Sequence, residues 1–285
     1  PAGPVKRMEN NRIAVARAIK QAGITQWGVA RYADVLPLLP VRAASRLPKN
    51  PRSVIVALLG YYTGEKEHNI SRYAWPRDYH LLAQQLMEPV AEQLRKAFPE
   101  QTFAVFTDNS PIREVTAARL AGLGFVGKNG LLINRRYGSY HFITEIVTDL
   151  ALIPDSPEEK SCGDCRRCLD ACPLGALSPE GVALSRCRSH ITQKKGELQP
   201  WERKEIEKGA LAWGCDICSD VCPYNQKAAL TDIPAFLQAV ESHITRENLP
   251  GLLKEKAFGW RGIAVMRRNL DIIDPPCSNG EETGE

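Results

Sequence analysis

Nine cysteines are the residues of this 285-residue chain whose type and spacing point most directly to chemistry. None lies before residue 162, and eight fall between residues 162 and 222 in two groups joined by one isolated cysteine. The groups read Cys162-x2-Cys165-x2-Cys168-x3-Cys172-Pro173 and Cys215-x2-Cys218-x3-Cys222-Pro223. Thiolates at such short spacing are typical ligands of iron–sulfur clusters or of zinc.

The first group has the spacing of bacterial ferredoxins, in which three cysteines ligate one 4Fe–4S cluster and the fourth ligates another. The second group matches the last three of these cysteines, and Ala212 stands where its first ligand would be. Cys187, isolated between the groups, is the predicted substitute. We therefore expect two 4Fe–4S clusters, the first held by Cys162, Cys165, Cys168 and Cys222, and the second by Cys172, Cys187, Cys215 and Cys218.

A pair of zinc sites is the alternative interpretation, because C-x2-C pairs also bind zinc. The C-x3-C-P ending of both groups favours the clusters. Cys277 lies in the polar tail and is predicted not to be a ligand. Two neighbouring clusters transfer single electrons without acting on a substrate, so the first 150 residues should contain the reaction centre.

The elements that must position this chemistry alternate between helix and strand. Hydrophobic periodicity predicts helices over residues 11–22, 79–98 and 111–121, and strands over 24–30, 53–62, 102–107, 131–134 and 141–148. Pro89 is expected to interrupt or bend the second helix. The alternation indicates an α/β (α+β) fold with helices packed on a sheet. We expect domains at 1–155 and 156–230, then a short helical region at 231–285 with a disordered tail from Asp274.

Composition excludes few classes of function. The 37 basic and 33 acidic residues indicate a mixed solvated surface, which permits a nucleic-acid partner without requiring one. Six basic residues are candidates for contact with RNA phosphates: Arg135, Arg136, Lys194, Lys195, Arg267 and Arg268. No apolar run approaches ~18 residues and no signal segment is evident, so we expect a cytoplasmic protein without a membrane segment. Thiols stay reduced in that compartment, which favours metal ligation over disulfides.

Three blocks that precede the cysteines carry a resemblance to a known family. They are Ser71-Arg72-Tyr73-Ala74 with Arg77-Asp78-Tyr79-His80; Phe106-Thr107-Asp108-Asn109-Ser110-Pro111-Ile112; and Ala121-Gly122-Leu123-Gly124-Phe125-Val126-Gly127-Lys128-Asn129 with Gly138-Ser139, Glu145 and Thr148-Asp149. With the order of the cysteines, they resemble the epoxyqueuosine reductase family over residues 10–226, with a weaker echo at 258–270. The chain is similar to a short form without the family's C-terminal helical repeats.

The resemblance implies a nitroreductase-like cobalamin-binding domain followed by a ferredoxin-like domain with two 4Fe–4S clusters. In that family the cobalamin is base-off, the clusters reduce its cobalt, and the epoxide of a modified base at the tRNA wobble position becomes an alkene. The implied partners are the anticodon region of tRNA and an electron donor such as a flavodoxin or ferredoxin system. We expect a monomer.

The resemblance also implies roles for individual residues. Asp108 matches the family's proton donor and would need a raised pKa to be protonated near neutrality. The alternative is that Asp108 or Ser110 caps the helix at Pro111. The implied cobalamin contacts are Tyr73, Asp78, Tyr79, Asn109, Ser110, Lys128, Asn129, Gly130, Gly138 and Ser139.

Each of these contacts also has a structural interpretation. Residues 73–79 could form a polar turn opening the long helix, and Gly127 and Gly130 could serve a helix C-cap and turn. His80 is expected to pack or hydrogen-bond near the start of that helix, and no histidine is predicted to ligate cobalt.

The chain departs from the family pattern at Val115, after Glu114, and at His190, after Cys187. Both positions fall on expected substrate surfaces. Two other functions therefore stay open. One is a paralogous cobalamin and iron–sulfur reductase acting on another substrate. The other is a ferredoxin-like electron-transfer protein without cobalamin, although such a module needs only ~60 residues.

Overall fold

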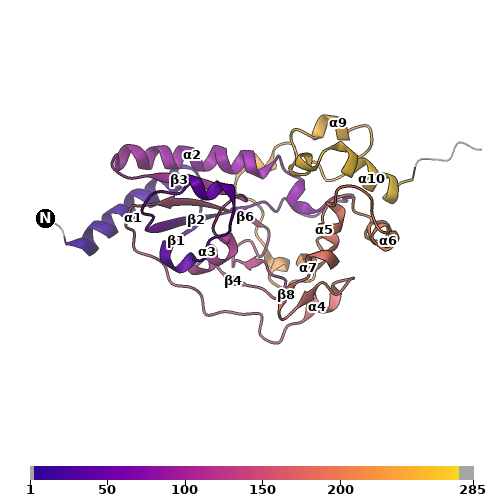
Figure 1. The fold of residues 1–285 in the computed structure, drawn as a ribbon, viewed down its shortest axis with the longest axis horizontal. Helices are drawn as coiled ribbons and strands as arrows, with labels where there is room; N and C mark the ends of the chain where they lie inside the picture. Colours follow the sequence, from indigo (N-terminus) through magenta and orange to yellow (C-terminus); the bar gives the residue numbers. More distant parts are fainter. Residues whose placement is uncertain (1–2, 276–285) are drawn as a thin grey trace, which may run out of the picture.

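A four-stranded antiparallel sheet forms the centre of the first half of the chain (Figure 1). The computed structural model describes residues 3–275. Along the sheet the order is β1 (Gln26–Arg31), β2 (Ser53–Gly60), β6 (His141–Thr148) and β3 (Phe103–Thr107). Glu145 of β6 pairs with Val56 on one side and Phe106 on the other, so it lies in the middle of the sheet.

Helices cover both faces of this sheet. On one face lie α1 (Pro4–Gln21) and α2 (Tyr79–Ala97), whose apolar side chains pack with Ile55, Ala57 and Leu59 of β2. On the other face, α3 (Glu114–Leu120) packs with Val54, Val56 and Leu58. Side chains of a strand alternate between faces, so an unbroken apolar run such as 54–59 fits a strand buried on both sides.

Most predicted elements of this half are present, with three differences. The first helix begins at Pro4, seven residues before its predicted start. The third begins at Glu114 and not at Pro111. The second continues through Pro89. Proline removes one helical hydrogen bond, to the carbonyl of Gln85, and that residue is exposed, so water can satisfy the carbonyl.

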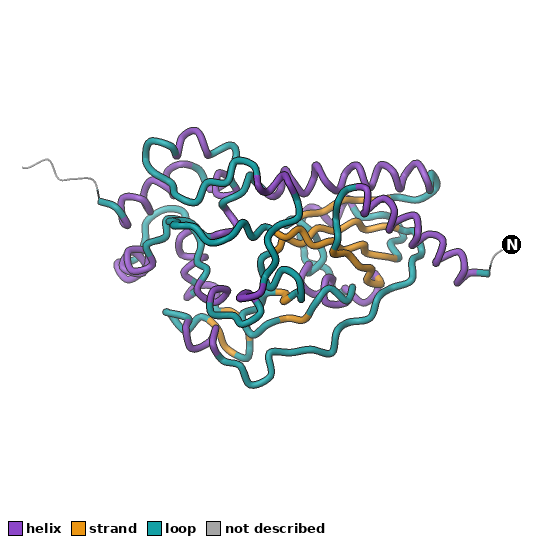
Figure 2. Tube along the Cα trace, turned by 180° about the vertical axis from the view of Figure 1, so that it is seen from behind, coloured by secondary structure: helices purple, strands orange, loops and turns teal. Residues whose placement is uncertain are grey.

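Short elements and loops make up the cysteine-rich segment. Its helices are α4 (Arg167–Ala171), α5 (Arg188–Thr192), α6 (Pro200–Gly209) and α7 (Ile217–Asp220). Two small hairpins accompany them, one from β4 (Phe125–Val126) and β5 (Leu132–Ile133), the other from β7 (Leu177–Ser178) and β8 (Gly181–Val182). Figure 2 shows that loops dominate this part. Its apolar side chains, such as Ile191, Ile206 and Trp213, are buried mainly together with residues of the C-terminal region.

The C-terminal region packs into both preceding parts. Its helices are α8 (Pro234–Leu237), α9 (Leu249–Leu252) and α10 (Ile263–Ile273), with a 3₁₀ turn, η6 (Ala257–Arg261), between the last two. Ile233 and Phe236 enter the core under α1 and α2. Phe258, Met266 and other apolar residues form a further core with Trp75 and Trp213. The segment after residue 230 therefore lies on both the sheet and the cysteine-rich part.

The tail predicted to be disordered lies, after Pro275, outside the described residues, as does Cys277. Within residues 3–275, no helix combines the length and the apolar character needed to cross a membrane.

Candidate active site and metal centres

The first predicted set of cysteines is brought together. Cys162, Cys165, Cys168 and Cys222 line one pocket, together with Lys128 and Tyr224. Cys222 lies 54 residues beyond Cys168 in the sequence, yet it meets the first three as the exchanged spacing predicts. All eight described cysteines have free thiols.

The second set gathers around Cys218. Burial, followed by the neighbouring thiols of Cys215, Cys187 and Cys168, raises the pKa of its thiol to about 12. Cys187 also raises the pKa of Cys215, after the larger effect of burial. The isolated Cys187 thus lies beside the C-x2-C pair it was predicted to complete. For Cys172 the structure records one sulfur contact, from the Ala176 amide at 3.3 Å, so its ligation of the second cluster stays a prediction.

The arrangement gives no support to zinc. In the described part of the chain, no three His, Cys, Asp or Glu side chains converge on one point as they would around a single ion. A zinc site brings four ligands to one ion, whereas a cubane cluster holds its four thiolates apart at separate iron atoms. The eight cysteines therefore fit clusters better than single ions.

Asp108 occupies a sharp turn immediately after β3. Its φ of 60° is in the left-handed region, which aspartate tolerates better than most residues. Its amide donates to Glu114 Oε1 at 2.7 Å, which holds the turn against the start of α3. Because α3 begins six residues later, Asp108 is not the cap of that helix. Ser110 is not its cap either, since its hydroxyl accepts from the Ile112 amide in a local turn.

His80 lies between two carboxylates. Its Nδ1 is 2.6 Å from Asp78 Oδ1, and its Nε2 is 3.1 Å from Asp108 Oδ2. Asp78 also caps α2 by accepting from the His80 amide. The Tyr79 ring stacks on the imidazole at a centroid distance of 4.0 Å. The predicted hydrogen bonding of His80 near the helix start is confirmed, and it extends to Asp108.

This contact sets where the proton resides. The hydrogen bond to Asp108, followed by that to Asp78, raises the pKa of His80 to about 9. The same bond lowers the pKa of Asp108 despite its partial burial. The prediction of a raised pKa for Asp108 is therefore wrong in this conformation, because a cationic neighbour outweighs desolvation. At neutral pH the proton lies on His80, one hydrogen bond behind the carboxylate.

Two further carboxyl groups lie behind the turn. Burial, followed by the charge of Asp108, raises the pKa of Glu114 to about 7. Glu145, fully buried in the sheet, has its pKa raised to about 8 by burial and then by Glu114. Ser110 donates to Glu145 Oε2 at 2.5 Å, whereas Oε1 is buried without a partner. These carboxyl groups hold protons near neutrality but do not reach the cavities around Asp108.

Three hollows meet around Asp108. One, of about 300 Å³, is lined by Tyr73, Tyr79, His80, Asp108, Ser189, Gln193, Ala257 and Trp260. A broader one, of about 550 Å³, lies between Asp108–Ser110 and the segment from Leu39 to Arg46. A third, of about 180 Å³, is shared by His80 and Asn109 with Arg46. Cys187 precedes α5, which carries Ser189, so the second cysteine set adjoins the first hollow.

The residues predicted to contact cobalamin fall into two groups. Tyr73, Tyr79, Asn109 and Ser110 line the hollows around Asp108, and Asp78 lies behind His80. Lys128 instead donates to the carbonyls of Gly163 and Cys165, at 2.7 and 2.9 Å, and lines the first cysteine pocket with Asn129. Its amine is thus engaged by the cluster-binding loop and is not free to reach a ligand beside Asp108.

Gly138 and Ser139 are also placed away from those hollows. A Cβ at Gly138 would meet Asn225 Oδ1 at 2.0 Å, so glycine is required by close packing against the cysteine-rich segment. The amide of buried Ser139 donates to the same oxygen at 2.7 Å. Gly130 has a φ of 79° and forms the turn of the Lys128 loop. These three positions contact or shape the cluster-binding loops, and their predicted contact with cobalamin stays a prediction.

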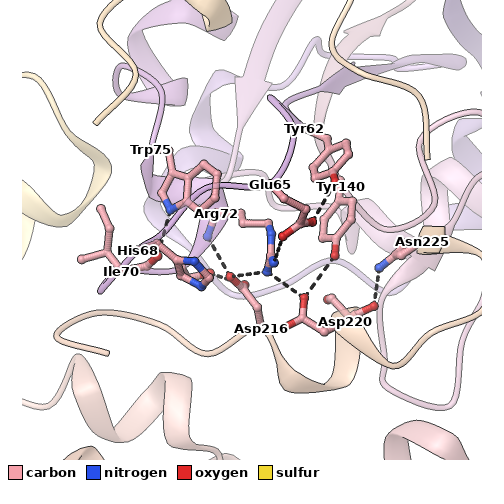
Figure 3. Close-up of polar contacts among 12 residues, drawn as sticks. Tyr62, Glu65, His68, Ile70, Arg72, Trp75, Tyr140, Asp216, Asp220 and Asn225 are labelled. Atoms are coloured by element: carbon pink, nitrogen blue, oxygen red, sulfur yellow. Dashed lines mark hydrogen bonds and ion pairs between the residues drawn. The ribbon is translucent and has the colours of Figure 1, made fainter. Parts of the chain in front are cut away.

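Arg72 joins the two halves of the site, a role that sequence reasoning missed (Figure 3). The side chain is 7% exposed, and its guanidinium meets Glu65 and Asp220 at 2.7 Å and Asp216 at 3.3 Å. Its amide also donates to Asp216, the residue after Cys215, at 2.8 Å. Ser71 adds a hydroxyl to the same carboxylate and an amide to the Trp213 carbonyl. The loop that presents Tyr73 to the hollow is thereby fastened to the second cysteine set.

Most of the six basic candidates for RNA contact are occupied within the chain. Arg135 pairs with Glu158 at 3.2 Å, and Arg136 with Asp232 at the same distance. Lys194 pairs with Glu202 at 2.8 Å. Arg268 donates to the carbonyls of Lys194 and Gly196. A role in binding phosphate therefore has weaker support for these four than the sequence suggested.

Comparison with known proteins points to one family. A family model described as epoxyqueuosine reductase QueG, DUF1730, matches residues 42–109, and one described as a 4Fe-4S double cluster binding domain matches residues 161–225. An epoxyqueuosine reductase from a Synechocystis strain is 43% identical over 194 residues, covering 65% of this chain and 67% of that protein. One from Leadbetterella byssophila is 35% identical over 239 residues, covering 80% and 79%.

Solved structures agree in fold. The structure of epoxyqueuosine reductase from Streptococcus thermophilus superposes with a TM-score of 0.78 at 27% identity, covering 93% of this chain and 80% of that one. A crystal structure of epoxyqueuosine reductase with an epoxyqueuosine-modified tRNA-Tyr stem loop superposes with a TM-score of 0.80 at 23% identity. That alignment covers 93% of this chain and 81% of the other.

Proposed function

Because this chain belongs to the epoxyqueuosine reductase family, we propose that it reduces the epoxide of epoxyqueuosine to the alkene of queuosine in tRNA. The observation that carries the proposal is the contact between His80 and Asp108 in a hollow that adjoins the second cysteine set. Conversion of an epoxide to an alkene takes up two electrons and two protons and releases the oxygen as water. The clusters are the proposed source of the electrons and the pair of His80 and Asp108 that of the first proton, and solvent supplies the second.

Electrons come from the two 4Fe–4S clusters of the double cluster domain. We assign the first cluster to Cys162, Cys165, Cys168 and Cys222, and the second to Cys172, Cys187, Cys215 and Cys218. The coupling of Cys168 to Cys218 supports close spacing of the two sets. The second cluster adjoins the hollow through Cys187 and α5, so it is the proposed exit for electrons. A flavodoxin or ferredoxin system is the proposed donor to the first.

We propose the broader hollow beside Asp108 as part of the site for cobalamin, the cofactor proposed from the family. Apolar Leu39, Val41 and Ala43 line it, with Val41 40% exposed, as a flat corrin would need. Ser45, Arg46, Asn109 and Ser110 offer polar groups for the amide side chains of such a cofactor. Bound there, cobalamin would supply a low-valent cobalt that delivers electrons to the epoxide. We propose a base-off form, within a nitroreductase-like domain that spans residues 1–155.

The proton for the departing oxygen comes from the pair of His80 and Asp108. His80 holds it at neutral pH, and His80 and Asp108 both line the hollow, the Asp108 side chain being 59% exposed. As negative charge develops on the substrate oxygen, the proton can move from His80 Nε2 to Asp108 across the 3.1 Å contact while Asp108 passes a proton to that oxygen. Asp78 keeps the imidazole oriented from the other side.

Two alternative functions are each tied to one specific observation. The altered position His190 follows Ser189, which lines the hollow, whereas Val115 packs against the core of the sheet. A change beside the hollow favours a related reductase that uses the same machinery on another substrate. An electron-transfer protein without cobalamin would leave the 550 Å³ hollow without a role. We propose that the working protein is a monomer acting on the anticodon region of tRNA.

The test is conversion of substrate by the reconstituted protein. Anaerobically reconstituted protein with a strong reductant would be incubated with tRNA that contains epoxyqueuosine, with and without cobalamin. Nucleosides from the digested RNA would then be quantified by mass spectrometry. Queuosine formed only with cobalamin supports the function and the cofactor together. Intact clusters and bound cobalamin without queuosine would point to another substrate, and iron without cobalt to an electron carrier.

A further inference from the structure

An exposed tryptophan stands at the rim of the hollow that contains Asp108. Trp260 is 60% exposed, which is unusual for so large an apolar side chain, and it lines the 300 Å³ hollow with Tyr79, His80 and Asp108. It belongs to η6 of the C-terminal region, which lies beside α5 at this end of the molecule (Figure 1). None of the reaction steps proposed above uses it.

The backbone that carries this indole is held tightly. A Cβ on the neighbouring Gly259 would meet the Leu253 carbonyl oxygen at 1.7 Å, so the turn packs directly on backbone. The buried amine of Lys256 donates to the carbonyls of Trp75, Pro76 and Ala239. The Glu255 carbonyl accepts from the Asp78 amide at 2.7 Å. The same segment that presents Trp260 therefore also fixes the turn that orients His80.

One side of the indole already has a partner. The guanidinium carbon of Arg261 lies 3.8 Å from the ring centroid, a cation–π contact that restrains the ring. An indole so restrained loses little side-chain entropy when a flat ligand covers it. Most of the ring is still open to solvent, beside the hollow where the reaction is proposed to occur.

We propose that Trp260 is a stacking platform for an unpaired base of the RNA substrate, adjacent to the nucleotide that enters the hollow. Proteins that bind single-stranded or looped RNA stack bases on exposed aromatic rings and arginine planes, and Trp260 with Arg261 presents both. Ser189 and Gln193 on the facing wall provide hydrogen-bonding groups for base edges. The inference rests on the proposed function, because it assumes that RNA reaches this hollow.

The four paired basic residues described above make this inference more specific. Arg135, Arg136, Lys194 and Arg268 have partners within the chain at or near the surface, and any contact that they make with phosphate depends on charge, whereas stacking on Trp260 does not. Stacking releases no counterions, so its loss should leave the salt dependence of binding unchanged, whereas the loss of a phosphate contact should reduce it.

The experiment compares Trp260→Ala and Trp260→Phe with a matched control, Trp201→Ala. Trp201 is 45% exposed on α6 and does not line the hollow. Each holoprotein would be titrated with a fluorescent anticodon stem loop at several salt concentrations, and KM and kcat would be measured with epoxyqueuosine tRNA. We expect Trp260→Ala to weaken binding and raise KM ~10-fold, with kcat and the salt slope unchanged and with most of the loss restored in Trp260→Phe.

Three outcomes would overturn the inference. They are unchanged RNA affinity in Trp260→Ala, an equal loss in Trp201→Ala, or loss of bound cobalamin in Trp260→Ala, which would make the indole a cofactor contact. The proposed function fails separately. If the wild type binds the stem loop through Trp260 but forms no queuosine, the platform stands and the assigned reaction does not.

Discussion

The Nε2 atom of His80 lies 3.1 Å from the Oδ2 atom of Asp108, and this contact moves their pKa values further apart. An isolated carboxylic acid at the mouth of a cavity would hold its own proton only if burial dominated. Here the pKa of Asp108 is lowered while that of His80 rises to about 9. The acid of the proposed reaction is therefore a pair of residues, and each can be tested alone.

Replacing Asp108 with asparagine should abolish turnover while both clusters and cobalamin stay bound. The substitution keeps the size of the side chain and tolerates the left-handed φ of 60°, but it removes the group that faces the hollow. A loss of at least ~100-fold in kcat is expected for an essential acid. Turnover would be measured beside iron content and the cobalamin spectrum. Full activity in this variant would remove Asp108 from the mechanism.

Turnover of the wild type should fall as the pH rises through about 9. His80 loses its proton in this range, and Asp108 can no longer be resupplied. His80→Gln should be slow at pH 7 and should lack this alkaline limb, because glutamine does not titrate. Single-turnover rates between pH 6 and 10 provide the measurement. An identical alkaline limb in both proteins would assign it to another group.

The same pKa shift affects stability. The folded-state pKa of His80 lies above its unfolded value of 6.5, so its contribution is fully present below about pH 6.5 and is lost as the pH rises through about 9. The Tm difference between wild type and His80→Gln should shrink across this window. A constant difference from pH 6 to 10 would contradict the assignment.

Glu145→Gln should stabilise the protein at alkaline pH. Burial raises the pKa of Glu145 to about 8, so its contribution to stability is greatest below its ordinary value of 4.5 and is lost as the pH rises through about 8. Glutamine removes the buried charge that would form above that range. Relative to wild type, we expect a gain of about 1–3 kcal/mol at pH 8.5 and little or none at pH 5. Urea unfolding at the two pH values decides between this and a pH-independent effect.

Cys187→Ala should remove the second cluster and keep the first. Its thiol adjoins Cys215 and Cys218, whereas the other four thiols line a separate pocket. We expect about half of the iron and acid-labile sulfide to remain after anaerobic reconstitution. Cys277→Ala is the matched control and should retain all of it. A full complement of iron in Cys187→Ala would refute the exchanged ligation.

Arg72→Met should destabilise the protein by roughly 3–5 kcal/mol, the typical cost of removing one partner from a buried ion pair. The methionine fills similar space but leaves the buried Asp216 carboxylate without its cation. Arg72→Lys should recover part of the loss, and Arg95→Met, at an exposed pair with Glu88, serves as the control. Denaturant unfolding would measure all three. Equal stability of Arg72→Met and the control would argue against the role of the network.

The sequence was a better guide to the candidate residues of the site than to the contacts and pKa values of those residues. Spacing alone predicted that Cys187 completes the ligand set of the C-x2-C pair, and the fold places its thiol near Cys215 and Cys218. Asp108 was identified by its sequence block, but its pKa was predicted with the wrong sign. His80 lies 28 residues away, and only the fold of α2 against β3 places the two side chains in contact.

Loop positions were the least predictable. Lys128 and Gly138 belong to the same sequence block as Glu145, which suggested a common cavity. Their loops instead turn towards the cysteine-rich segment, where Lys128 meets Gly163 and Cys165, and Gly138 meets Asn225. Trp260 lies in the weaker echo at 258–270, but its position at the hollow could not be predicted, since it belongs to a segment 152 residues from Asp108 in the sequence. Hydrophobic periodicity predicts each helix or strand separately. Contacts between loops that are far apart in the sequence arise only when these elements pack together.

The ion pair and the hydrogen bond between Arg72 and Asp216 also have a thermodynamic consequence. One end of that loop presents Tyr73 to the hollow, and the other holds the carboxylate next to Cys215. If occupation of the hollow shifts the loop, it must change the electrostatic environment of the second cluster. Linkage then requires the reverse effect of equal size, so the reduced protein and the oxidised protein would bind substrate with different affinities. Reduction of the second cluster and binding of the substrate would in that case be linked by a single coupling free energy.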